Sequence, residues 1–140
     1  MQDEAAAGDT TEVRTARPAQ IFLCEDDPVI RLALEDAVTE MGHRCIVAAK
    51  NRYEALEELA SKDEVDLAIL DVDLQGNRST AVHDALRALN IPYILFTGFD
   101  RTQLQQMGFT ATAMRKPARP EDVVAFALAH AREYWMRHAA

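Results

Sequence analysis

Short apolar runs alternate along this chain with segments whose apolar residues recur at helical spacing. The runs are continuously apolar, as strands buried on both faces of a parallel sheet are. They occupy residues 20–25, 45–48, 67–71, 93–96 and 111–114. Helices are predicted at about 28–41, 53–61, 79–89 and 100–107, and from Pro120 onward. This alternation predicts a single α/β domain on a five-stranded parallel sheet, with no second domain and no internal repeat.

Local signals support these elements. Asp27 is a candidate cap for the first helix, Pro28 suits its first position and Gly42 ends it. The apolar stripe of this helix is Ile30, Leu34, Ala37, Val38 and Met41, and that of the second helix includes Tyr53, Leu56, Leu59 and Ala60. Cys24 and Cys45 lie in apolar runs without zinc or redox spacing, so we expect buried free thiols.

Length and charge limit the classes of function. At 140 residues the chain is long enough for one packed core. No apolar run approaches the ~20 residues that span a bilayer. Residues 1–20 lack the apolar segment of a signal peptide, so we expect a cytoplasmic protein. The net charge of −8 argues against direct binding to nucleic acid. Residues 1–18 predict a disordered tail before a folded domain at 19–137.

Acidic side chains follow two of the predicted strands. Glu25 and Asp26 come after the first strand, and Asp71 and Asp73 come at the end of the third. The carboxyl ends of neighbouring parallel strands meet at one edge of a sheet, which is where ligands bind in such folds. Two like charges ~4 Å apart repel by ~4 kcal/mol at an effective dielectric of ~20, so this cluster needs a cation. Carboxylates suit Mg²⁺ or another divalent ion such as Mn²⁺, and the main-chain carbonyl of Asp73 could add a ligand.

This set of residues suits the binding and transfer of a phosphoryl group. A carboxylate such as that of Asp71 can attack phosphorus. Thr97 follows the fourth strand and could donate a hydrogen bond, while Lys116 follows the fifth and supplies positive charge for a phosphoryl oxygen. Each residue alone has a plainer structural interpretation, as a turn or a surface charge. The spacing of all these residues together favours a phosphoryl-transfer site over the plainer interpretations.

The sequence resembles the receiver domain of two-component response regulators from about Gln20 to about Ala131. The stretches that carry the resemblance are Phe22-Leu23-Cys24-Glu25-Asp26-Asp27-Pro28, Leu67-Ala68-Ile69-Leu70-Asp71-Val72-Asp73-Leu74, Ile94-Leu95-Phe96-Thr97-Gly98 and Lys116-Pro117. The resemblance implies a flavodoxin-like (CheY-like), doubly wound sheet with strand order 2-1-3-4-5.

The resemblance also implies roles for individual residues. Asp71 would be the phosphoacceptor, and Glu25 and Asp26 the acidic metal pair. Asp73 would offer its main-chain carbonyl, and Thr97 and Lys116 would bind the phosphoryl group. The donor would be a phosphohistidine on a sensor histidine kinase or a phosphotransfer protein.

A narrower likeness is to the single-domain receivers called the FATGUY group, which are common in alphaproteobacteria and often paired with HWE-type kinases. It is carried by residues 71–79 and 91–99, although Leu95-Phe96-Thr97-Gly98-Phe99 stands where that group has Phe-Ala-Thr-Gly-Tyr. By the resemblance to receiver domains, the first helix and residues 116–118, which flank the site, would form the kinase-docking surface. Ile30 is a candidate contact there, although its helical stripe equally predicts a core position.

The chain departs from most receivers at two aromatic positions. Ala113 stands where an aromatic usually changes rotamer on activation, and Ala118 replaces the aromatic that follows the Lys-Pro pair. The stretch from Thr97 to Lys116 is also short, which predicts a shortened fourth helix. We therefore hypothesise that phosphorylation orders residues 99–110 instead.

Other functions remain open at this point. A metal-dependent phosphatase of the haloacid dehalogenase type would use Asp71 and Asp73 as paired aspartates, but that family places the pair on its first strand. A pseudo-receiver that binds partners without phosphorylation would explain the missing aromatics. We expect a phosphoacceptor signalling protein rather than an enzyme. The sequence leaves open its downstream partner, its oligomeric state, and whether it signals through protein contacts or acts as a phosphate sink.

Overall fold

The structure is a computed structural model that describes residues 17–138. Its strands are β1 (Gln20–Cys24), β2 (Arg44–Ala49), β3 (Leu67–Leu70), β4 (Asp73–Leu74), β5 (Asn77–Arg78), β6 (Tyr93–Thr97) and β7 (Ala113–Arg115). Its helices are α3 (Pro28–Glu40), α4 (Arg52–Ser61), α5 (Thr80–Ala88), α6 (Arg101–Gln106) and α7 (Pro120–Arg137). The predicted tail lies outside the described residues except for Arg17 and Pro18, and Arg17 forms an ion pair with Asp66 at 2.9 Å.

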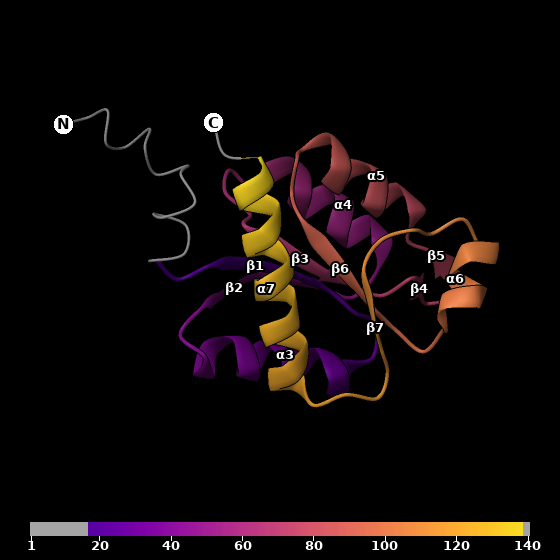
Figure 1. The fold of residues 1–140 in the computed structure, drawn as a ribbon, viewed down its shortest axis with the longest axis horizontal. Coiled ribbons are helices and arrows are strands. Elements are labelled where there is room, and N and C mark those ends of the chain that lie inside the picture. Colours follow the sequence, from indigo (N-terminus) through magenta and orange to yellow (C-terminus); the bar gives the residue numbers. More distant parts are fainter. Residues whose placement is uncertain (1–16, 139–140) are drawn as a thin grey trace.

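Five parallel strands form the central sheet in the order β2-β1-β3-β6-β7. In chain order this is 2-1-3-4-5, so the predicted flavodoxin-like topology is confirmed. Figure 1 shows α3 and α7 on one face of the sheet and α4 and α5 on the other. Each crossover helix returns the chain to the same end of the sheet, so all five strands end at one edge.

Both faces of the sheet are buried in apolar cores. Successive residues of a strand point to opposite faces, so Ile21 and Leu23 pack under α3 and α7 while Phe22 and Cys24 pack under α4 and α5. This two-sided burial explains why the strands are continuous apolar runs in the sequence. Cys24 is buried as expected, but Cys45 is only partly buried, because β2 is an edge strand. Both thiols are free.

The ends of α3 follow the predicted signals. Asp27 Oδ1 accepts hydrogen bonds from the backbone N–H groups of Val29 (2.9 Å) and Ile30 (3.3 Å), and Pro28 occupies the first helical position. After the helix, Gly42 adopts a left-handed φ of +86°. The predicted fourth helix is the short α6, which Asp100 caps. The fifth strand begins at Ala113, two residues later than predicted.

The hairpin of β4 and β5 is not among the elements predicted from the sequence. The two strands pair in antiparallel register, Asp73 with Arg78 and Leu74 with Asn77. Gln75 and Gly76 between them have φ values of +54° and +83°, the signs of a type I′ turn. The hairpin follows β3 directly and therefore lies at the edge of the sheet where the strands end.

Within residues 17–138, no helix is both long and apolar enough to cross a membrane.

Candidate functional site

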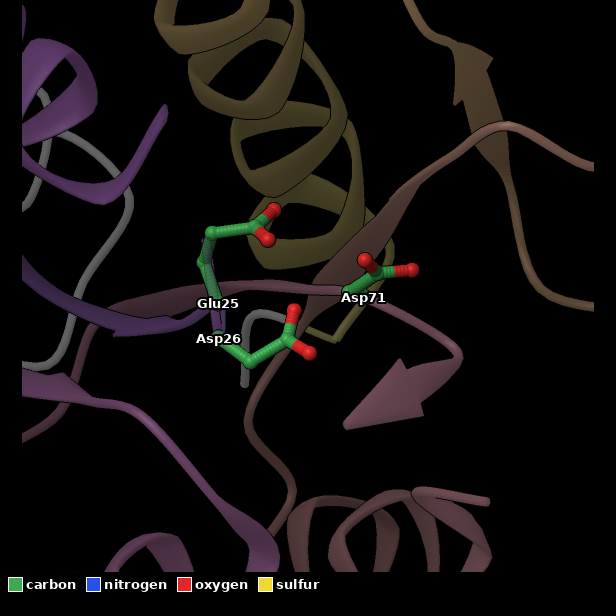
Figure 2. A group of neighbouring side chains, drawn as sticks. All are labelled: Glu25, Asp26 and Asp71. Carbon is green, nitrogen blue, oxygen red and sulfur yellow. The ribbon is translucent and has the colours of Figure 1, made fainter. Parts of the chain in front are cut away.

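Three carboxylates meet where β1 and β3 end. Glu25, Asp26 and Asp71 each place an oxygen within 4.8 Å of the others (Figure 2). Backbone hydrogen bonds extend the sheet by one residue beyond each strand: Glu25 N–H donates to Ala49 O (2.9 Å) and Asp71 N–H to Cys24 O (3.0 Å). These bonds fix where the acidic residues leave the sheet. The predicted convergence of the three acids is therefore confirmed.

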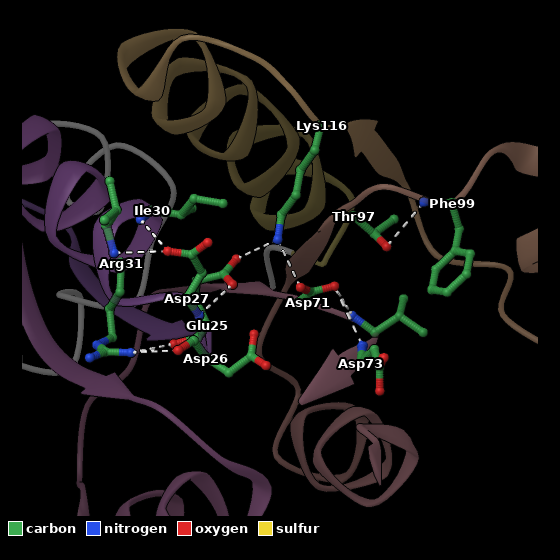
Figure 3. A network of polar contacts seen from close by, with 12 residues as sticks. Glu25, Asp26, Asp27, Ile30, Arg31, Asp71, Asp73, Thr97, Phe99 and Lys116 are labelled. Carbon is green, nitrogen blue, oxygen red and sulfur yellow. Dashed lines mark hydrogen bonds and ion pairs between the residues drawn. The ribbon is translucent and has the colours of Figure 1, made fainter. Parts of the chain in front are cut away.

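Lys116 joins two of these acids. Its Nζ lies 2.8 Å from Glu25 Oε1 and 2.8 Å from Asp71 Oδ2 (Figure 3). Its backbone N–H donates to Thr97 O at 2.7 Å, which aligns the residue after β7 with the end of β6. The ammonium also lies 5.5 Å from the centre of the Phe96 ring. Because β6 lies between β3 and β7 in the sheet, Lys116 reaches across the end of β6 to contact the acids.

Burial and charge shift the acid–base behaviour of this pair. Burial raises the pKa of Glu25 to about 7, although the hydrogen bond from Lys116 opposes the change. Burial alone would lower the pKa of Lys116, but its hydrogen bonds to Asp71 and Glu25 outweigh that effect and the pKa rises. With all groups ionised, three carboxylates and one ammonium leave a charge of −2. A divalent cation with a preference for oxygen ligands fits this donor set.

The remaining oxygens of Asp71 and Asp26 contact backbone N–H groups. Asp71 Oδ1 accepts a 2.7 Å hydrogen bond from Val72 N–H and a longer one, 3.4 Å, from Asp73 N–H. Asp26 Oδ2 accepts a 2.8 Å hydrogen bond from Gln75 N–H in the hairpin. Asp73 thus contacts the site through its backbone, while its carbonyl as a metal ligand stays a prediction.

Thr97 lies fully buried at the end of β6, next to the site (Figure 3). Its Oγ1 accepts a 3.4 Å hydrogen bond from Phe99 N–H, which is too long to be strong. The centre of the Phe99 ring lies 5.6 Å from the guanidinium carbon of Arg78. The helix α6, Arg101–Gln106, occupies the middle of residues 99–110. The effect of phosphorylation on residues 99–110 stays a prediction.

The alanines at the two departures lie in different surroundings, and Ala113 lines a surface pocket together with Phe99 and Phe126. Ala113 is exposed on β7, and Ala118 is partly buried against the core under α7. Ile30 also packs partly against that core, which supports its structural interpretation. The exposed apolar side chains of α3 are instead Val29, at 76% exposed, and Leu32, at 59%.

Arg31 contacts the backbone of the site in a way that the sequence did not predict. Its Nη1 donates hydrogen bonds to the backbone carbonyls of Glu25 (2.8 Å) and Asp26 (3.3 Å). The helical pattern places this residue outside the apolar stripe of the first helix, which indicates no contact with the site. The available signal was its position in the first turn of a helix, where a positive charge is normally unfavourable.

Comparisons with known proteins agree with this geometry. The family model for the response regulator receiver domain matches residues 21–127. The phyllosphere-induced regulator PhyR of Methylorubrum extorquens is 29% identical over 117 residues, which is 81% of this chain and 44% of that protein. The transcriptional regulatory protein PdtaR of Mycobacterium tuberculosis is 28% identical over 114 residues, 81% of this chain and 55% of that protein. The chain thus spans about half the length of these relatives.

Solved structures show the same likeness. The solution structure of SdrG from Sphingomonas melonis matches with a TM-score of 0.69 at 32% identity, over 81% of this chain and 96% of that one. The receiver domain of PhyR from Erythrobacter litoralis matches with a TM-score of 0.70 at 26% identity, over 84% of this chain and 92% of that one.

Proposed function

Because this chain belongs to the response regulator receiver family, we propose that Asp71 accepts a phosphoryl group from the phosphohistidine of a sensor histidine kinase or a phosphotransfer protein. The observation that carries the proposal is the convergence of Glu25, Asp26 and Asp71 with the ammonium of Lys116 at one edge of the sheet. Receiver domains are signalling phosphoacceptors rather than conventional enzymes, and they generally bind Mg²⁺ in an acidic pocket.

In this proposal Glu25, Asp26 and Asp71 would hold Mg²⁺ through carboxylate oxygens, and the carbonyl of Asp73 would be a further protein ligand. Bound there, the ion would supply positive charge to the carboxylates and to the incoming phosphoryl oxygens. Mn²⁺ would serve equally, since it also prefers oxygen ligands.

The transfer breaks the P–N bond of the phosphohistidine and forms a P–O bond to a carboxylate oxygen of Asp71. The nitrogen of the donor keeps the electron pair of the broken bond. Lys116, now bonded to Asp71 Oδ2, can pass its hydrogen bond to a phosphoryl oxygen. The Thr97 hydroxyl can then donate to another, since Oγ1 acts as the acceptor in its contact with Phe99 N–H and that contact does not use the hydroxyl proton.

The consequence of phosphorylation would be transmitted by protein contact. The surface around α3 and residues 116–118 would receive the kinase, and an HWE-type kinase fits the narrower likeness. The exposed Val29 and Leu32 of α3 offer apolar contacts at this surface. Active signalling and service as a phosphate sink both follow from the same chemistry. The proposed location is the cytoplasm, where such a phosphohistidine donor occurs.

The direct test is intact-mass analysis after incubation with a small phosphodonor and Mg²⁺. The wild type should gain one phosphoryl group, whereas chelator-treated protein and Asp71→Asn should gain none. An unmodified wild type would favour a pseudo-receiver that only binds partners. Steady turnover of a generic phosphate ester would favour a phosphatase of the haloacid dehalogenase type.

A further inference from the structure

Arg31 holds the backbone of both acids that lie between β1 and α3. Its Nη1 donates to Glu25 O at 2.8 Å and to Asp26 O at 3.3 Å, so one nitrogen binds two consecutive backbone carbonyls (Figure 3). Side chains on a helix lean toward its N-terminus, so an arginine in the first turn of α3 can reach back to the segment before the helix. The side chain is partly buried there rather than solvated.

The location of this arginine is unfavourable by itself. Partial positive charge at a helix N-terminus disfavours a nearby cation. The first turn of α3 contains no acidic residue that would offset this cost. The two carbonyls and the neighbouring carboxylates therefore account for an arginine at this position. A hydrogen bond from a charged donor to a carbonyl is stronger than one between neutral groups.

We infer that Arg31 is a positioning residue for the metal site, an inference that rests on the function proposed above. By fixing the carbonyls of Glu25 and Asp26, it orients the peptide groups from which both carboxylates project toward Asp71. Two backbone N–H groups secure the carboxylates themselves: Asp27 N–H donates to Glu25 Oε2 at 3.1 Å, and Gln75 N–H to Asp26 Oδ2 at 2.8 Å. Arg31 acts on the backbone and these groups act on the side chains.

The direction in which Mg²⁺ affinity changes when Arg31 is replaced separates a positioning role from simple electrostatic repulsion. A positive charge near a cation site repels the cation, so removing a bystander arginine would strengthen Mg²⁺ binding. Removing a positioning arginine leaves the acids less well placed and weakens binding despite the lost repulsion. Loss of groups that orient metal ligands typically lowers metal affinity about 10- to 100-fold.

The experiment is calorimetric titration of the phosphate-free chain with Mg²⁺. Arg31→Met keeps the packing of the side-chain stem and removes the guanidinium, and it should weaken Mg²⁺ binding about tenfold or more. Arg31→Lys keeps the charge but not the planar head group, so its affinity should lie between the two. Arg119→Met is the matched control: Arg119 follows Lys116 closely, its side chain is 74% exposed and its ion-pair partner is Glu121. Its affinity should be unchanged or higher.

Thermal unfolding in chelator establishes that each variant is folded, and Arg31→Lys carries the test if Arg31→Met is not. Amide resonances of residues 25–27 should also shift in the metal-free Arg31→Met spectrum. Equal or tighter Mg²⁺ binding by Arg31→Met would overturn the positioning role while leaving the proposed function intact. A wild type that binds no Mg²⁺ would overturn both.

Discussion

The ammonium of Lys116 donates a 2.8 Å hydrogen bond to Asp71 Oδ2, and so connects the residue after β7 with the residue after β3. The same ammonium reaches Glu25 Oε1 at 2.8 Å. Both acids are nearly buried, with side chains 3% and 10% exposed. Breaking such a buried pair is costly, because the remaining charges are left without water or a counter-ion.

Replacing Lys116 with methionine should therefore destabilise the metal-free protein by about 3 kcal/mol, the magnitude found when one partner of a buried ion pair is lost. Mg²⁺ should restore part of this stability, since it neutralises the same carboxylates. Urea unfolding with chelator and with Mg²⁺ measures both effects. Lys62→Met is the control: its ion pair with Glu58 is a surface pair, with side chains 38% and 39% exposed, and should contribute below about 1 kcal/mol. Equal losses for the two variants would contradict the prediction.

Asp26→Asn should separate stability from metal binding. Asparagine keeps an oxygen for the hydrogen bond from Gln75 N–H but removes one negative charge from the cluster. The variant should be at least as stable as the wild type in chelator, because repulsion among the acids falls. Saturating Mg²⁺ should stabilise the wild type by about 3 kcal/mol at 100 times its Kd, and the variant by much less. Calorimetric melting in both conditions is the measurement, and equal stabilisation by Mg²⁺ would exclude Asp26 as a ligand.

His83 should make the protein sensitive to mild acid. The ring is 1% exposed, contacts Tyr93 and Phe109, and its Nε2 has no hydrogen-bond partner among the described residues. Burial, aided by the charge of Arg87, lowers the pKa of His83 to about 4. The unfolded chain takes up the proton near pH 6.5 and the folded chain only near pH 4. Stability is therefore fully present above pH 6.5 and falls as the pH drops toward 4, by at most about 3 kcal/mol.

The control for this prediction is His83→Leu, which cannot be protonated. Its free energy of unfolding will differ from that of the wild type at every pH because the ring contacts change. The informative quantity is the slope between pH 6.5 and 4, measured by urea unfolding. This slope should be smaller in the variant, and parallel curves would contradict the assignment to His83.

The sequence predicted the sheet and the acidic cluster because both depend on coarse patterns. Continuous apolar runs identify buried strands, and the right-handed crossover rule places their ends together. Helix faces were predicted less well: Tyr53 is 67% exposed and Ala55 is buried in its place. Helical spacing alone leaves such a small rotation undetermined, because packing against the sheet selects the buried face. The position of Arg31 in the first turn of α3 is a signal, but its contacts also depend on a side-chain rotamer, which that position does not specify.

Phosphorylation should displace the segment around α6. Phe99 N–H contacts Thr97 Oγ1 at 3.4 Å, and the Phe99 ring packs against the guanidinium of Arg78, so a hydroxyl that turns toward a phosphoryl oxygen would loosen both contacts. Amide resonances of residues 99–110 should shift when Mg²⁺ and a beryllofluoride phosphoryl analogue are added. The shifts should shrink in Phe99→Ala. Unchanged resonances in the wild type would exclude this route of signal transmission.

The β4–β5 turn should tolerate a stabilising substitution. Gln75 has a φ of +54°, a left-handed conformation that asparagine adopts more readily than glutamine. Asn-Gly is the preferred pair for a type I′ turn, so Gln75→Asn should stabilise the protein by about 0.5 kcal/mol. Urea unfolding measures the gain, and Gln75→Val should show a loss, since a β-branched residue is strained at positive φ. Because Gln75→Asn leaves in place the backbone N–H that donates to Asp26 Oδ2, Mg²⁺ affinity should stay unchanged. A change in affinity without a change in stability would show that the glutamine side chain itself contacts the metal site.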